Sequence, residues 1–115
     1  MSVSGKACVM QCSGTIDSPD STTTLQPLLL QLHDRLVGAG VDTVRLDVSG
    51  MEYMNSSAIK CFMAWFLKAE RSKDAAYSIT VVFDKQRTWQ YVSFTTMGRV
   101  APRVLKTHAL NEQAP

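Results

Sequence analysis

Two stretches of the chain repeat their apolar residues at the spacing of an α-helix. In the first, leucines lie at i, i+3, i+4, i+7 and i+11, which predicts a helix that begins near Thr24 and ends at Gly38 or Gly40. Pro27 is expected in its first turn, where a missing N–H costs nothing. The second stretch predicts the clearest helix, which fades into the polar segment 71–74. The two stripes consist of Leu25, Leu28, Leu29, Leu32 and Leu36, and of Ile59, Phe62, Met63, Phe66 and Ala69.

Three other stretches have the composition of β-strands. Residues 7–13 are rich in apolar side chains and stop at Gly14, where a turn or a bulge is expected. Residues 41–49 alternate between apolar and polar positions and end at Gly50 in a turn signal. Residues 77–83 are β-branched and aromatic, which is typical of a nearly buried strand.

The remaining segments have weaker patterns. Residues 15–24 are rich in Asp, Ser, Pro and Thr and predict a loop, with a short strand near 15–17. Residues 87–97 predict a third, less regular helix that ends at Gly98. Residues 104–110 form either an edge strand or an unpaired tail.

Strands and helices therefore alternate along the chain. Crossovers of this length join parallel neighbours with a right-handed turn, so we expect an α/β fold. The prediction is a single layer of four or five mixed strands with helices mainly on one face. The length of 115 residues predicts one domain over 1–115, with its core at about 7–98 and the fold of 99–115 left open.

Composition excludes several classes of function. The 12 basic and 10 acidic residues give a net charge of +2 without any basic run, which gives no support to nucleic-acid binding. The three cysteines are odd in number, lack the spacing of a metal site and follow no secretory leader, so we expect a reducing cytoplasm. The longest apolar run, Cys61 to Leu67, is far shorter than the roughly 20 residues of a membrane span, so no membrane association is expected.

The segment Asn55-Ser56-Ser57 lies where the second helix should begin. Unpaired N–H groups and the positive end of the helix dipole stabilise a hydroxyl or an anion there. One interpretation is that Asn55 or Ser56 simply caps the helix. The other is that a serine accepts phosphate, which adds about −1.5 to −2 charge at pH 7.

Two motifs in this chain resemble those of STAS domains, which occur in bacterial anti-sigma factor antagonists and in the cytoplasmic tails of sulfate transporters. Residues 47–50 and 55–59 resemble the signature D-[FL]-S-G-x-x-x-x-D-S-S-G-[LI]. Residues 14–17 resemble the family's G-x-[LI]-D at the second strand. Asn55 stands in place of the usual aspartate, and Ala58 stands in place of the usual glycine.

The resemblance implies a bacterial partner-switching regulator of transcription that is not an enzyme and needs no cofactor or metal. Ser56 would be the phosphoacceptor, and the unphosphorylated protein would bind an anti-sigma factor that is itself a serine kinase. A PP2C-like serine phosphatase would restore binding. Asp17 would lie near the acceptor on the partner-facing surface, together with the neighbouring residues Asn55, Ser57, Ala58 and Ile59.

The second helix offers a further candidate surface. Cys61, Trp65 and Lys68 lie away from the apolar stripe, so they form either a docking surface beside Ser56 or part of a wider buried arc. Cys8 and Cys12 lie four apart on one strand and therefore share a face, where we expect packing and not chemistry.

Two other classes of function stay open. A STAS-like sensory module would bind a nucleotide or small anion at the same helix N-terminus without being modified. An enzyme would use Ser56 or Cys61 as a nucleophile, but the sequence places neither His33 nor His108 beside them as a general base, and it contains no G-x-S-x-G or P-loop motif.

Overall fold

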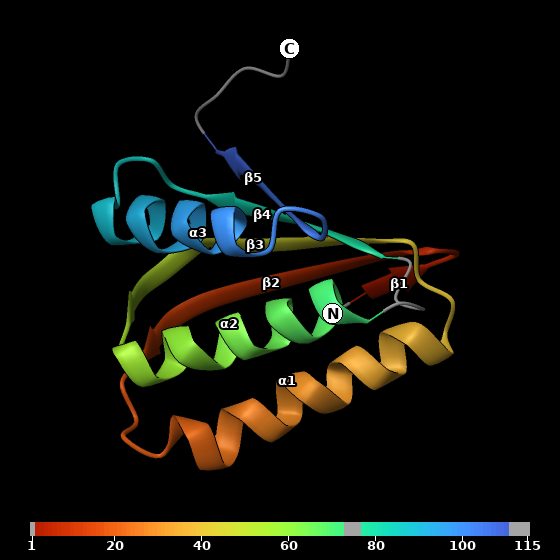
Figure 1. The fold of residues 1–115 in the computed structure, drawn as a ribbon. Helices are drawn as coiled ribbons and strands as arrows, with labels where there is room; N and C mark the ends of the chain where they lie inside the picture. The colour runs from red at the N-terminus through yellow and green to blue at the C-terminus, as the bar shows by residue number, and fades with distance from the viewer. Residues whose placement is uncertain (1, 73–76, 111–115) are drawn as a thin grey trace.

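The computed structural model describes residues 2–72 and 77–110, with side chains from residue 5 onward (Figure 1). Within these residues the chain forms five strands and three helices. They are β1 (Ser2–Ser4), β2 (Ala7–Ile16), α1 (Ser21–Gly38), β3 (Thr43–Met54), α2 (Ser56–Arg71), β4 (Ser78–Phe83), α3 (Thr88–Val100) and β5 (Leu105–Ala109).

The strands form one sheet in the order β1-β2-β3-β4-β5. Strands β2 to β5 run parallel to one another, and β1 is antiparallel to β2. Each crossover moves one place in the same direction, and right-handed crossovers of this kind put their helices on one face. Figure 1 shows α1 and α2 side by side, with α3 farther along the sheet near β4 and β5. The predicted α/β layer is thus confirmed as four parallel strands with three interleaved helices.

The sheet has one covered face and one open face. In β3, Val44, Leu46 and Val48 are buried against the helices, while Arg45 and Asp47 point the other way. This is the alternation that residues 41–49 predict. Neighbouring strands repeat it, so the open face presents a mostly polar row across the sheet: Val9, Arg45, Thr80 and Lys106.

The three cysteines pack in the core, which was the expectation for Cys8 and Cys12. Cys8 and Cys61 are buried, and Cys12 is half-buried against the same core. Burial raises the pKa of all three thiols above the ordinary value. Because a neutral thiol is a poor nucleophile, these cysteines serve as small apolar residues.

Helix α1 begins at Ser21, three residues before the predicted start at Thr24. The hydroxyl of Ser21 donates to the Ser18 carbonyl at 2.9 Å, and that of Thr24 donates to the Asp20 carbonyl at 3.1 Å. These bonds organise a first turn that composition alone assigned to a loop. Pro27 consequently lies inside the helix and not in its first turn, so the prediction for Pro27 is wrong.

Strand β3 continues to Met54 and does not end at Gly50. Its last part pairs with β2, which also runs on through Gly14 to Ile16, with two register shifts between the strands. Gly14 has a φ of +92°, so the expected irregularity is a bulge. At Gly50 a Cβ atom would lie 3.2 Å from the Cβ of Ser13, which explains why the smallest residue stands there. The strand predicted at 15–17 is therefore the end of β2.

The C-terminal elements are more regular than the sequence indicates. Helix α3 passes through Gly98 and ends at Val100, and β5 completes the sheet as the edge strand that was one of the two expectations for residues 104–110. In the part of the chain that the structure describes, no helix has the length and apolar character that a membrane span requires.

Candidate functional site

Ser56 is the first residue of α2, and its side chain is exposed. Only Asn55 separates it from the end of β3. Ile16 at the end of β2 pairs with Met54 at the end of β3, so the chain leaves both parallel strands at the same edge of the sheet. Asp17 follows Ile16 and is exposed at this edge. Two of the predicted site segments, far apart in sequence, therefore meet.

Asn55 connects these two segments and caps the helix. Its side-chain oxygen accepts a hydrogen bond from the Ala58 N–H at 2.8 Å, which is the usual N-cap contact. Its side-chain amide donates to the Ser18 carbonyl at 3.0 Å, and its backbone N–H donates to the Ile16 carbonyl at 2.9 Å. An aspartate would accept from Ala58 but would have no hydrogen for Ser18. Asparagine therefore suits this position because it both caps α2 and holds the loop that carries Asp17.

The residues after Ser56 turn progressively into the core. Ser57 and Ile59 are half-buried, and Ala58 is fully buried under the start of the helix. The expectation that Ala58 lies on the partner-facing surface is therefore wrong, because its methyl group packs against the core cluster. Ser56 is the serine of the pair that an external enzyme or partner reaches more easily.

The first turn of α2 keeps unused hydrogen-bond donors. The N–H groups of Ala58 and Ile59 bond to Asn55, whereas those of Ser56 and Ser57 donate no hydrogen bond to any residue that the structure describes. Such donors, with the helix dipole, favour negative charge at the helix start.

Cys61 and Trp65 are completely buried, so they do not form an exposed docking surface. The thiol of Cys61 donates to the Ser21 carbonyl at 3.3 Å, and the indole N–H of Trp65 donates to the Tyr77 hydroxyl at 3.1 Å. The reason is that α2 packs on strand residues of the core cluster on one side and on α1 on another, which widens its buried arc beyond one stripe. Of the two interpretations of these residues, the buried arc is correct.

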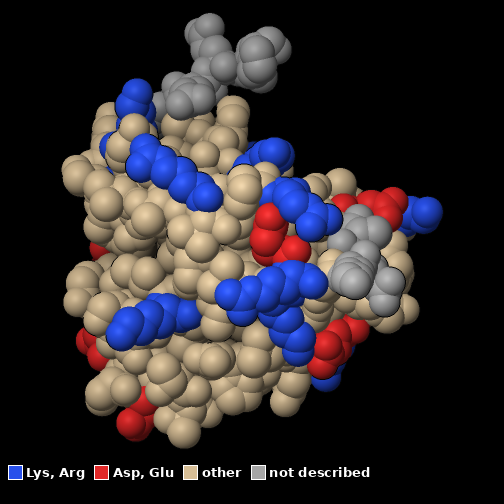
Figure 2. Space-filling model, viewed as in Figure 1, with Lys and Arg blue, Asp and Glu red and all other residues tan. Residues whose placement is uncertain are grey.

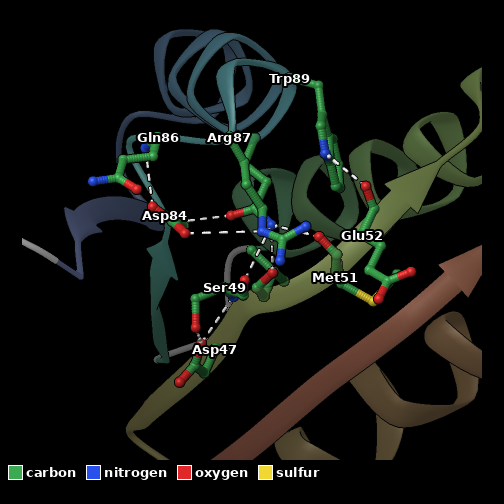
Figure 3. A network of polar contacts seen from close by, with 10 residues as sticks. Asp47, Ser49, Met51, Glu52, Asp84, Gln86, Arg87 and Trp89 are labelled. Atoms are coloured by element: carbon green, nitrogen blue, oxygen red, sulfur yellow. Dashed lines mark hydrogen bonds and ion pairs between the residues drawn. The ribbon is translucent and has the colours of Figure 1, made fainter.

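The N-terminal part of α3 holds the segment of β3 that leads to Asn55 (Figure 3). The side-chain amide of Gln90 is fully buried and donates to the carbonyls of Val48 and Met51 at 2.9 and 2.8 Å. Its oxygen accepts from the Asp84 N–H at 2.8 Å. The indole N–H of Trp89 donates to the Glu52 carbonyl at 3.1 Å. These hydrogen bonds cannot be predicted from sequence patterns, because Trp89 and Gln90 lie in a weakly periodic helix and nothing in their spacing distinguishes them from its other residues.

A second polar cluster lies at the other end of α2. His33 contacts the Tyr77 hydroxyl through Nδ1 and the Ser72 hydroxyl through Nε2, the latter at 3.4 Å. Burial, then nearby Lys68, lowers the pKa of His33, and burial raises the pKa of Tyr77 to about 12. Since α2 has 16 residues and is about 24 Å long, His33 is out of reach of Ser56 as a general base.

The described residues contain no group of three or more His, Cys, Asp or Glu side chains placed to hold a metal ion. No protein-family model matches the chain, and no curated protein matches it in a sequence search. The fold is thus an α/β sheet of four parallel strands and three helices with no family identified.

Proposed function

We propose that this protein is a phosphorylation-controlled protein-binding module of the anti-sigma factor antagonist type, which works in a bacterial partner-switching pathway. In its unphosphorylated form it binds an anti-sigma factor that is also a serine kinase, and phosphate on Ser56 releases it. A PP2C-like serine phosphatase removes the phosphate. The protein acts in the cytoplasm and has no catalytic role of its own.

The observation that carries the proposal is the position of Ser56. It is exposed, it directly follows the helix cap, and it lies at the sheet edge where Asp17 also emerges. The resemblance of residues 47–50, 55–59 and 14–17 to the STAS signature puts the acceptor serine at this same place.

The local geometry accommodates a phosphate without cost to the fold. The first turn of α2 offers the free N–H groups of Ser56 and Ser57 and the positive end of the helix dipole, worth roughly 0.3–1 kcal/mol toward a negative charge. For a partner that packs against Ser56 closely, the same group adds bulk, charge and a cost of desolvation. The modification therefore changes binding and leaves folding intact.

Phosphorylation in the native cell tests the assignment. We expect the intact protein to carry one phosphoryl group, which peptide mass spectrometry places on Ser56. Ser57→Ala should retain the label, because it is the matched control one residue away and half-buried. Full labelling of Ser56→Ala would overturn the assignment.

A second candidate is a sensory module that binds a nucleotide or small anion at the start of α2. The free N–H groups of Ser56 and Ser57 favour it. Calorimetry against ATP, ADP, GTP and inorganic phosphate distinguishes the two functions. Heat of binding that Asn55→Ala abolishes would favour the sensory module, and no heat with any of the four would exclude it.

A further inference from the structure

The outward face of α2 extends from Ser56 to the end of the helix. Ser56, Lys60, Ala64, Leu67 and Arg71 are separated by four, four, three and four residues, so they lie on one side of the helix. Lys60 and Arg71 are exposed, and Ala64 and Leu67 are half-buried. This face therefore has a hydroxyl at its start, an apolar middle and a cation on each side of that middle.

A groove runs along the apolar part of this face, between α2 and α1. Its volume is about 480 Å³, and its lining combines apolar residues with two cations: Leu30, Ala64, Leu67, Lys68, Arg71 and Ser72. Figure 2 faces the helix layer and shows Lys and Arg side chains spread over it, with uncharged surface beside them and some Asp or Glu side chains among them. The groove has room for apolar side chains, and its rim attracts negative charge.

Within residues 5–72 and 77–110, Lys60 and Arg71 have no carboxylate partner. Lys68 lies 3.8 Å from Asp34, but both side chains are well exposed, so this pair is readily exchanged for another. The two oxygens of Glu70 accept the N–H groups of Arg103 and Val104 at 3.1 and 2.8 Å, and none of the three ion pairs of the described residues includes Glu70.

We propose that the groove between α1 and α2 binds an acidic amphipathic helix of the partner protein. Its apolar side chains would pack on Leu30, Ala64 and Leu67, and its carboxylates would face Lys60, Lys68 and Arg71.

The link between this groove and Ser56 rests on the proposed function. Lys60 lies one turn from Ser56, so a phosphate on Ser56 attracts the Lys60 ammonium and repels the carboxylates of the partner at the same time. The partner is then opposed by charge over the Ser56–Lys60 end of the face and not by contact at one hydroxyl alone.

Two synthetic helical peptides test the groove. One has leucines at i, i+3, i+4 and i+7 flanked by glutamates, and the other has glutamine at every glutamate position. We expect the acidic peptide to bind at least about fivefold tighter at low salt, to lose that advantage at high salt, and to shift the amide resonances of Leu30, Ala64 and Leu67. Equal binding of the two peptides, no binding of either, or shifts confined to the open sheet face would overturn the groove proposal.

Charge variants provide the matched comparison. Lys60→Glu and Arg71→Glu should each lower the affinity for the acidic peptide by about three- to tenfold, since each replaces an attraction by a repulsion. Arg45→Glu and Lys106→Glu make the same change on the open sheet face and should have no effect. Loss of affinity in these two controls equal to that in Lys60→Glu would show attraction to net charge alone and overturn the site.

A phosphomimetic separates the groove from the switch. Ser56→Glu should lower the affinity for the acidic peptide several-fold and leave the affinity for the glutamine peptide unchanged. If Lys60 and Arg71 matter but Ser56→Glu has no effect, the link to Ser56 is overturned and the groove stands. If Ser56 is never phosphorylated in cells while the peptide results hold, the proposed function fails and the groove stands.

Discussion

Asn55 forms hydrogen bonds with Ile16, Ser18, Ala58 and Ile59, and the start of α2 depends on them. Replacing it by alanine removes the bond from Ala58 and the bond to Ser18 together. We expect Asn55→Ala to lower the free energy of unfolding by about 1–2 kcal/mol, the usual cost of losing an N-cap. Urea denaturation measures this change, and an unaltered midpoint would show that the cap contributes nothing.

Asn55→Asp provides the control for that experiment. Its carboxylate still accepts from Ala58 and suits the positive end of the helix, but it cannot donate to Ser18. We expect a stability close to that of the natural protein, with faster amide exchange in the segment around Ser18. Equal losses in both variants would mean that the bond to Ser18, and not the cap, dominates.

At the level of elements, α3 supports the end of β3 after β3 has left β4. The pairing of β3 with β4 stops at Asp47 and Val82, and Gln90 takes up the carbonyls of Val48 and Met51 beyond that point. The side chain of Gln90 thus satisfies backbone groups that a neighbouring strand would otherwise satisfy.

Gln90→Leu should therefore be among the most damaging substitutions in the chain. It leaves two carbonyls and the Asp84 N–H without their partner, which we expect to cost about 3 kcal/mol or more. Gln86→Leu is the matched control, because the Gln86 side chain is exposed. Thermal and urea denaturation compare the two, and similar losses in both would contradict the assigned role of Gln90.

The elements that sequence patterns predict well are those whose burial has a simple period. Helix α2 begins at Ser56 as expected because a cap sequence precedes a regular apolar stripe, and β3 shows the expected alternation because one sheet face is open. The wrong end of β3 and the unexpected burial on α2 both result from contacts between residues that are distant in sequence. Pairing with β2 carries β3 past a local turn signal at Gly50, and packing of α1 on α2 buries Cys61 and Trp65.

The candidate site shows the same division. The position of Ser56 at a helix start and the meeting of Asp17 with Asn55 follow from motif and strand order. The hydrogen bonds from Gln90 and Trp89 to the end of β3 cannot be predicted in this way, because only the folded chain reveals which carbonyls lack a partner in the sheet.

For the molecule as a whole, stability should decline on the acidic side of neutrality. His33 titrates near 6.5 when unfolded, and its pKa is lower in the folded protein because of burial first and Lys68 second, partly offset by Asp34. The unfolded chain therefore binds more protons, and the free energy of unfolding should fall as the pH drops below about 6.5. His33→Gln should flatten that slope below about pH 6.5 in urea denaturation. An unchanged slope would assign the loss to other groups.

The opposite shift of Tyr77 limits stability at high pH. Its pKa is raised from 10.0 to about 12 in the folded protein, so its contribution is complete below pH 10 and is lost as the pH rises toward 12. Tyr77→Phe should be less stable near neutral pH, because Trp65 and His33 lose their partner, yet less sensitive to pH in this range. Denaturation curves at several alkaline pH values check both effects, and a variant that keeps the full alkaline slope would contradict them.

The junction between β3 and α2 consists of Asn55 alone, hydrogen-bonded on both sides. A linker of one hydrogen-bonded residue is too short to act as a hinge, so α2 should not rotate relative to the sheet when its first residue is modified. A phosphorylated form should superpose on the unmodified one almost atom for atom outside Ser56. Any partner that distinguishes the two must then respond to the charge and bulk of the added group itself and not to a movement of the helix.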